Sequence, residues 1–149
     1  MKAATLEPEP IAEPIGVPAE PEALHDDKRK KPFSSFEKVA VVSPEAAILD
    51  IWSYIYKLLR QLADQQGVIA RNAKSTIDQL AVKGLLTGLE VSLLNDLRVM
   101  RNLAAHSGDV ETPVTLSDAV RYREIAQTIE PTLVRAINAH TRPPSFQSD

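Results

Sequence analysis

The sequence predicts an all-α protein: a bundle of four or five helices, mainly antiparallel, with a disordered N-terminal tail. From residue 43 onward, apolar residues recur every three or four positions, which is the period of an amphipathic helix. No segment alternates apolar and polar residues for long enough to form a strand, apart from a weak run at 38–42 that we interpret as a short extended lead-in. The loops between the helical segments are short, and short loops favour antiparallel neighbours.

We divide the 149 residues into a tail at 1–36, a helical domain at 37–142 and a disordered C-terminus at 143–149. The tail consists mostly of Pro, Glu, Ala, Lys and Asp, a composition that buries too little apolar surface to offset the entropy of ordering. We expect Phe33 and Phe36 to attach its end to the domain.

The tail also carries a basic run at 28–31, next to the acidic pair Asp26 and Asp27. We favour a solvated linker here, because the acidic pair weakens the positive field and most charge runs are solvated. Contact with RNA, anionic lipid or an acidic partner stays open as the alternative.

The first long helix is expected from Ser43 to about Gln66. Ser43 is a good N-cap, and Pro44 suits the first helical position, where its missing N–H costs nothing. Gly67 should end the helix. Its apolar stripe is formed by Ile48, Ile51, Trp52, Ile55, Leu58, Leu59 and Leu62. Trp52 shares the spacing of its aliphatic neighbours, so we interpret it as a core residue rather than a base-stacking platform.

A short second helix is predicted from Ser75-Thr76-Ile77-Asp78 to near Gly84, and residues 68–74 are either irregular or one more turn of helix. The third helix is expected at 88–106. Thr87 and Glu90 fit a capping box at its start. Gly108 has the position of a left-handed terminator. Its predicted apolar stripe comprises Leu89, Leu93, Leu97, Met100 and Ala104.

The last helix is expected to follow a variant capping box, Thr115 to Asp118, and to end before Pro143. Pro131 lacks the N–H that would reach Gln127, so a kink or a break is predicted at Glu130. The inward residues of this helix are predicted to be Ala119, Tyr122, Ala126, Ile129, Leu133 and Ile137.

The end of the third helix gathers three functional side chains. At ~100° per residue, Asn102 and His106 share one stripe and Arg101 lies on the adjoining one. Ala104 and Ala105 leave the backbone accessible beside them. Arginine offers a fixed charged fork that matches phosphate oxygens, and histidine exchanges a proton near neutral pH. The stretch therefore predicts a phosphodiester site, with Arg98 as a weaker substrate-binding residue that extends the positive patch or pairs with a neighbour.

The end of the third helix resembles the motif of the HEPN superfamily, whose members carry Arg-x(4–6)-His. Here Arg101 is followed directly by the polar residue Asn102 and, after three more residues, by His106. The stretches 43–48, 94–98 and 119–122 also resemble a group of uncharacterised bacterial HEPN-like domains, and the likeness covers roughly residues 43–140. The resemblance implies a four- or five-helix domain that dimerises and binds or cleaves RNA without a metal, in defence or toxin–antitoxin systems.

Metal-free cleavage of RNA needs a base, an acid and positive charge at the phosphorane, and it leaves 2′,3′-cyclic phosphate ends. Arg101, Asn102 and His106 are the candidate catalytic residues. One chain supplies one such histidine, because His25 lies in the tail and His140 at the end of the last helix. A two-fold homodimer would bring a second copy of the site to the first.

Other chemistry is excluded by residue type. The chain has no cysteine, which removes disulfides, thiolate zinc sites and cysteine nucleophiles and suits a reducing cytoplasm. It has no metal-binding motif, no glycine-rich phosphate loop and no membrane-spanning apolar run. We therefore expect no metal and no cofactor.

Two functions stay open at this point. Besides RNA or an antitoxin as partner, the sequence allows a non-catalytic helical dimerisation or interaction module. In that second interpretation, Arg101 and His106 only meet the negative end of the helix dipole, and Asn102 bonds a neighbouring helix. The balanced charge of residues 37–142 does not favour nonspecific RNA binding, which generally needs a basic face.

Overall fold

The computed structural model describes residues 32–109 and 113–141, and within them it contains five α-helices, one short 3-10 helix and no strand. The helices are α2 (Phe36–Val42), α3 (Pro44–Gln65), α4 (Ala73–Val82), α5 (Gly88–Ala105), η3 (Ser107–Asp109) and α6 (Leu116–Thr141). The predicted all-α bundle is confirmed. Residues 1–31 of the expected disordered tail at 1–36 lie outside the described residues, as does the expected disordered C-terminus at 143–149. The end of that tail is wrong, because residues 32–34 are helical and Phe36 begins α2.

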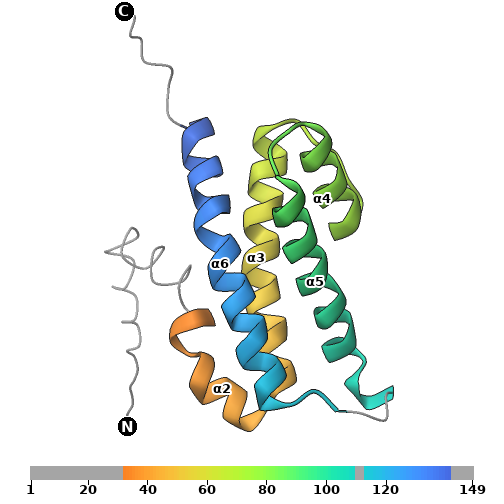
Figure 1. The fold of residues 1–149 in the computed structure, drawn as a ribbon, viewed down its shortest axis with the longest axis vertical. Helices are drawn as coiled ribbons and strands as arrows, with labels where there is room; N and C mark the ends of the chain where they lie inside the picture. The colour runs from red at the N-terminus through yellow and green to blue at the C-terminus, as the bar shows by residue number, and fades with distance from the viewer. Residues whose placement is uncertain (1–31, 110–112, 142–149) are drawn as a thin grey trace, which may run out of the picture. The chain divides into compact units, whose positions relative to one another are not determined.

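The long helices pack side by side around α3. Figure 1 shows α5 running antiparallel to both α3 and α6, with α4 beside the upper part of α5 and α2 at the lower end of the bundle. Helix α3 contacts α2, α4, α5 and α6, and it supplies ten buried residues to the core. It is therefore the central element on which the others are positioned.

The predicted bounds of α3 are confirmed. The Ser43 side chain accepts a hydrogen bond from the backbone N–H of Ala46, and Pro44 occupies the first helical position. Every residue of the predicted apolar stripe is buried, Trp52 included. The chain leaves the helix through Gly67, whose φ of 70° lies in the left-handed region that glycine adopts without strain.

Helix α4 begins earlier than the sequence predicted. Its N-cap is Asn72, whose side-chain oxygen accepts from the Ser75 N–H at 2.8 Å. Thr76, expected near the cap, is instead fully buried, and its hydroxyl donates to the Asn72 carbonyl at 2.8 Å. Serine and threonine cap helices often, so the sequence alone did not single out the asparagine.

Helix α5 starts as predicted and ends differently. The capping box is present, with Thr87 N–H bonded to Glu90 Oε1 at 2.8 Å and Glu90 N–H bonded to Thr87 Oγ1 at 3.2 Å. Gly108 has no positive φ, because the chain continues directly into η3 instead of reversing through a left-handed residue. His106 is the C-cap, and its N–H bonds to the Asn102 carbonyl at 3.1 Å.

The buried face of α5 is shifted from the predicted stripe. Leu94, Leu97 and Ala104 are buried, whereas Leu89 is 70% exposed and Met100 is only partly buried. The sequence contains apolar residues on more than one side of this helix, so periodicity alone could not tell which side faces the core.

Helix α6 begins with the predicted cap, in which Thr115 and Asp118 exchange two hydrogen bonds of 2.9 and 3.1 Å. It continues through Pro131, so of the predicted kink or break at Glu130 the break is wrong. The buried residues Ile129 and Leu133 on either side of the proline hold the helix against the core despite the lost N–H bond.

The predicted extended lead-in at 38–42 is also wrong, because these residues belong to α2. Helix α2 buries Phe36 and Ala40. The Arg123 guanidinium of α6 lies 4.5 Å from the centre of the Phe36 ring, and Phe33 meets Tyr54 edge to face. The two phenylalanines thus attach the start of the domain to the bundle, as expected.

No helix among the described residues combines the length and the apolar content that crossing a bilayer demands.

Candidate functional site

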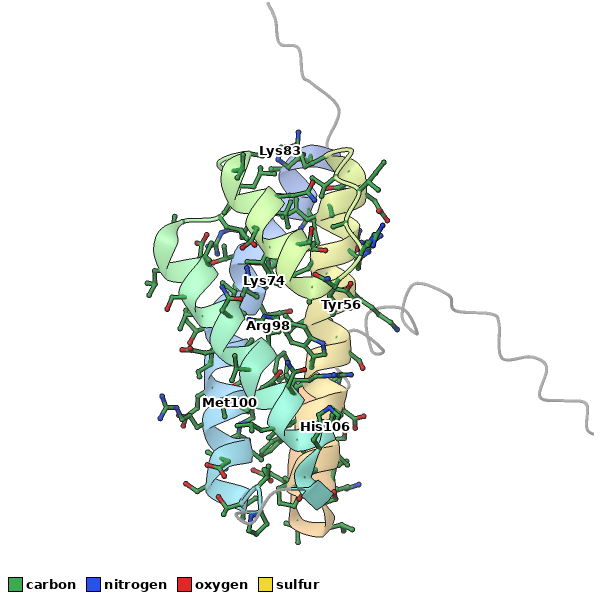
Figure 2. The ribbon with its side chains drawn as sticks, turned by 90° about the vertical axis from the view of Figure 1, so that its right-hand side faces the viewer. Tyr56, Lys74, Lys83, Arg98, Met100 and His106 are labelled. Carbon is green, nitrogen blue, oxygen red and sulfur yellow. The ribbon has the colours of Figure 1, made fainter. Side chains whose placement is uncertain are left out.

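The candidate site is an open cleft of about 710 Å³ between α3, the start of α4 and the middle of α5. Figure 2 faces this side of the bundle, with Lys74 of α4 and Arg98 of α5 near its centre and Tyr56 of α3 beside them. The cleft is lined by Trp52, Tyr56, Asn72, Ala73, Lys74, Ser75, Asp78, Arg98, Arg101 and Asn102.

Helix α5 supplies two guanidinium groups and an amide to one wall of the cleft. Arg98, Arg101 and Asn102 are spaced three and four residues apart, which places them on the same flank of a helix. Arg98 Nε donates to Asn95 Oδ1 at 3.2 Å, and Arg101 Nη1 donates to Asn102 Oδ1 at 3.3 Å. These bonds orient both guanidinium groups and leave other donors of each available to a ligand.

The opposite wall is the first turn of α4. The first N–H groups of a helix have no partner within it, and they carry a partial positive charge. The Asn72 side chain takes one of these N–H groups, that of Ser75. Lys74 Nζ bonds Asp78 Oδ2 at 2.9 Å, and both side chains border the cleft.

The cleft is positively charged within a nearly neutral domain. Its lining includes Lys74, Arg98 and Arg101 but only one carboxylate, that of Asp78. Residues 37–142 contain equal numbers of basic and acidic residues, and the whole chain has a formal charge of −3. Positive charge thus exceeds negative charge at this cleft, although the net charge of zero for residues 37–142 did not favour a basic face.

Arg101 also reaches toward the core. Its Nε atom is buried and has no hydrogen-bond partner among the described residues. The fully buried Tyr122 donates its hydroxyl proton to the Leu97 carbonyl at 3.1 Å. Burial raises the pKa of Tyr122, and the nearby Arg101 charge opposes that rise. The Nε atom of Arg101 is therefore held by packing, and the residue also lines the cleft.

The third wall is aromatic. Trp52 and Tyr56, one turn apart on α3, stack with ring centres 5.8 Å apart and planes inclined by 7°. Trp52 is 7% exposed, so its predicted place in the core is confirmed, although one edge also borders the cleft. Tyr56 is half-buried and lines the cleft together with Trp52.

The structure separates His106 from the other candidate residues. Arg101, Asn102 and Arg98 line the cleft together, whereas His106 is exposed at the C-cap of α5 and does not line it. Figure 2 shows His106 on the same viewed side as Arg98, further along α5. By helical geometry it lies one turn beyond Asn102 and is turned further outward than Arg101.

Sequence reasoning assigned Trp52 to the core and did not find the other residues of these two walls. Tyr56 follows Trp52 by four positions, so the helical spacing was a usable signal for it. Asn72, Lys74 and Ser75 join the site only because α4 folds back beside α5, and no pattern in the sequence indicated that contact. Within the described residues there is also no group of three or more His, Cys, Asp or Glu arranged to hold a metal ion.

Residues 34–139 match the family model of a domain of unknown function, DUF4145. The chain belongs to this family. The match spans α2 to α6 almost completely, so the DUF4145 domain includes all three walls of the cleft. Neither the curated proteins nor the solved structures contain a match to the chain.

Proposed function

We propose that this DUF4145 domain binds RNA, with the phosphate backbone held in the cleft. The observation that carries the proposal is the convergence of Arg98 and Arg101 from α5 with Lys74 at the start of α4. Three cations from two helices face one open space, and this arrangement suits a phosphate group with its several acceptor oxygens.

The cleft chemistry favours a phosphodiester over a carboxylate or a sugar. Guanidinium groups bond phosphate oxygens in a forked geometry, and the N-terminus of α4 adds N–H donors and positive potential on the opposite side. Asn102 and Ser75 supply neutral polar groups that suit ribose hydroxyls or further phosphate oxygens. The compact site explains how a domain without net positive charge would grip RNA locally.

The proposal is tested by measuring the affinity of the full chain for a labelled single-stranded RNA. Replacing both Arg98 and Arg101 by alanine should weaken binding by roughly 100-fold, because a hydrogen bond to a charged group contributes about 1.5–3 kcal/mol. The slope of log affinity against log salt should fall by about 0.7 for each lost phosphate contact.

The matched control is Lys83→Ala. Lys83 is exposed at the end of α4 that lies away from the cleft (Figure 2). Its replacement removes one positive charge, as Arg98→Ala does, but leaves the cleft unchanged. Arg98→Ala alone is included because Arg101 packs beside Tyr122. Equal weakening by Lys83→Ala and Arg98→Ala would contradict binding in the cleft.

A second candidate, metal-independent cleavage of RNA by a HEPN-like homodimer, is favoured by the position of His106. On the outward side of α5, the histidine lies between the cleft flank and the exposed apolar residues Val99 and Leu103, which are 48% and 51% exposed. A dimer formed through these residues would bring two histidines close to each other and to both clefts. One would act as base on the 2′-hydroxyl and the other as acid on the leaving oxygen.

Cleavage is tested by incubating the protein with labelled RNA in EDTA and scoring 2′,3′-cyclic phosphate ends. His106→Ala should abolish the cyclic ends and leave RNA affinity within about twofold, because the histidine is outside the cleft. Leu103→Glu should give a monomer in light scattering and stop cleavage. Wild-type chain that dimerises but neither binds nor cuts RNA would identify an interaction module instead.

With either activity, we propose a cytoplasmic setting in defence or in a toxin–antitoxin pair, where a protein antitoxin would be a further partner. An antitoxin that covers the cleft would compete with RNA for Arg98 and Lys74, and this competition is measurable in the same binding assay.

A further inference from the structure

The ring faces of the aromatic wall offer no hydrogen-bond donor to a phosphate. Tyr56 lies against Trp52 with the two rings nearly parallel, and both rings border the same space as Arg98 and Arg101. The Tyr56 hydroxyl makes no hydrogen bond within the described part of the chain, so the ring is not tied to a neighbouring helix through its polar end. A site that binds only a phosphate needs charged or polar donors, so it does not account for the flat apolar face of an aromatic ring in the cleft.

We propose that the cleft takes one unpaired nucleotide of the RNA strand, with its base against the Tyr56 ring and its phosphate between Arg98 and Arg101. This inference rests on the proposed function and adds the form of the RNA that the site selects. Aromatic side chains stack on bases of any sequence, and a base joined to a phosphate is the ligand that combines a flat apolar part with an anionic part.

The dimensions and openness of the cleft agree with a single nucleotide. Its volume of about 710 Å³ lies in the range typical of small-molecule sites. Helical walls stand on three sides, from α3, α4 and α5. A base in a duplex is stacked between its neighbours and exposes only its edges, so it cannot present its face to a ring at the wall of such a cleft. The site should therefore discriminate against paired RNA.

The cations are placed for the phosphate rather than for the base. Arg98 is anchored through Asn95, and Arg101 through Asn102, so both guanidinium groups are fixed along the α5 wall. Lys74 lies on the α4 wall and forms a salt bridge with Asp78. The aromatic pair belongs to α3. Separate helices thus carry the two kinds of contact, and each kind is removable without the other.

Trp52 provides a direct reporter, because it is the only tryptophan of the chain and lies against Tyr56 at the cleft. Titration of the wild-type chain with a single strand of about eight uridines, within the usual site sizes for single-strand binding, should change the tryptophan fluorescence in a saturable way. A stable GC-rich RNA duplex of the same length should bind at least about tenfold more weakly.

Two ligands separate the base from the phosphate. Uridine monophosphate should also change the Trp52 fluorescence, at higher concentration than the strand, whereas inorganic phosphate should bind without the same change. An identical fluorescence change with inorganic phosphate would overturn the contact with the base.

Substitution of Tyr56 completes the test, with affinity measured by anisotropy of labelled RNA so that an altered Trp52 signal does not interfere. Tyr56→Leu should weaken the single strand by roughly 5- to 100-fold, and Tyr56→Phe should keep wild-type affinity, because the ring is retained. Circular dichroism of each variant checks the fold.

Failure of this inference differs from failure of the proposed function. RNA that binds the wild-type chain and Tyr56→Leu equally, without preference for the single strand, would overturn the nucleotide subsite and leave RNA binding intact. No binding of either RNA form to the wild-type chain would overturn both.

Discussion

The two accessible sides of α5 differ in what they offer. On the side toward α4, Arg98 and Arg101 face a cleft whose other walls belong to neighbouring helices. On the outward side, Val99 and Leu103 are about half exposed, and His106 lies at the border between the two. Besides its buried apolar face, α5 thus presents a charged flank that borders an open cleft and an apolar outward side that no other helix among the described residues covers.

The difference shows that the residues of the Arg101–His106 motif lie in two different environments. Arg101 and Asn102 line a concave polar cleft, which favours an anionic group. His106 belongs to an open surface, which favours a macromolecular partner or a second copy of the chain. The adjacency of these residues in sequence conceals this division, because one turn of helix is enough to change the neighbours completely.

The comparison is tested most strongly by removing one leucine from the buried face of α5 and one from its outward face. Leu97→Ala should lower the free energy of unfolding by about 2–5 kcal/mol, because it leaves a cavity in the core. Leu103→Ala should change it by about 0.5 kcal/mol or less. Urea denaturation of both variants gives the two values. Similar losses would show that the outward face is packed in solution.

The next effect concerns the charge across the cleft from α5. Lys74→Ala should lower RNA affinity by about tenfold, because it removes one charged phosphate contact. It should leave stability almost unchanged, since the Lys74–Asp78 pair is exposed and such pairs contribute little. Lys83→Ala, at the other end of α4, removes the same charge outside the cleft. Comparison of the two variants therefore shows whether RNA affinity depends on where the lysine lies or only on the net charge of the chain. A loss of stability without a loss of affinity would reverse our assignment.

A smaller effect is expected at Tyr122, where the buried face of α5 meets α6. Tyr122→Phe removes the hydrogen bond to the Leu97 carbonyl and should cost about 1 kcal/mol at neutral pH. Unfolding titrations of the variant and the wild-type chain measure this difference.

The same residue predicts a pH dependence. Burial raises the pKa of Tyr122 in the folded chain, so its stabilising contribution is complete below the unfolded value of about 10 and is lost as the pH rises above it. Wild-type stability should thus fall more steeply than that of Tyr122→Phe from about pH 9.5 to 11. Parallel curves would show that the hydroxyl is solvated.

An effect of similar size on stability, with none on RNA affinity, is expected at the start of α5, away from both sides. Thr87→Ala removes one half of the capping box and should lower stability by about 1 kcal/mol, as measured by thermal unfolding. RNA affinity should not change, because Thr87 does not line the cleft. A parallel loss of affinity would indicate that fraying of α5 reaches Arg98.

Much of the fold was predictable from local signals. The caps at Ser43, Thr87 and Thr115 are each satisfied by contacts within a few residues, so their sequence signatures sufficed. The start of α4 and the break at Pro131 were predicted wrongly for a different reason. The cap of α4 competed with better-known cap residues nearby, and packing of α6 against the core overrode the helix-breaking tendency of proline.

The site was predictable only in part. Arg98, Arg101 and Asn102 share one flank of one helix, and helical spacing is sufficient to group them. Their contact with the same cleft as Lys74 and Tyr56 depends on how three helices pack. The spacing of residues along a single sequence does not reveal such packing. His106 lies outside the cleft because it is one turn further along α5 than Asn102, and how far the cleft extends along α5 depends on where α4 packs.

The most direct measurement of the central claim is a titration of isotope-labelled chain with single-stranded RNA, followed through the backbone amide signals. We predict that the largest shifts occur at Ala73, Lys74, Arg98, Arg101 and Asn102, which surround the cleft. Shifts confined to the outward side of α5, around Val99 and Leu103, with unchanged signals at the start of α4, would contradict an RNA site in the cleft.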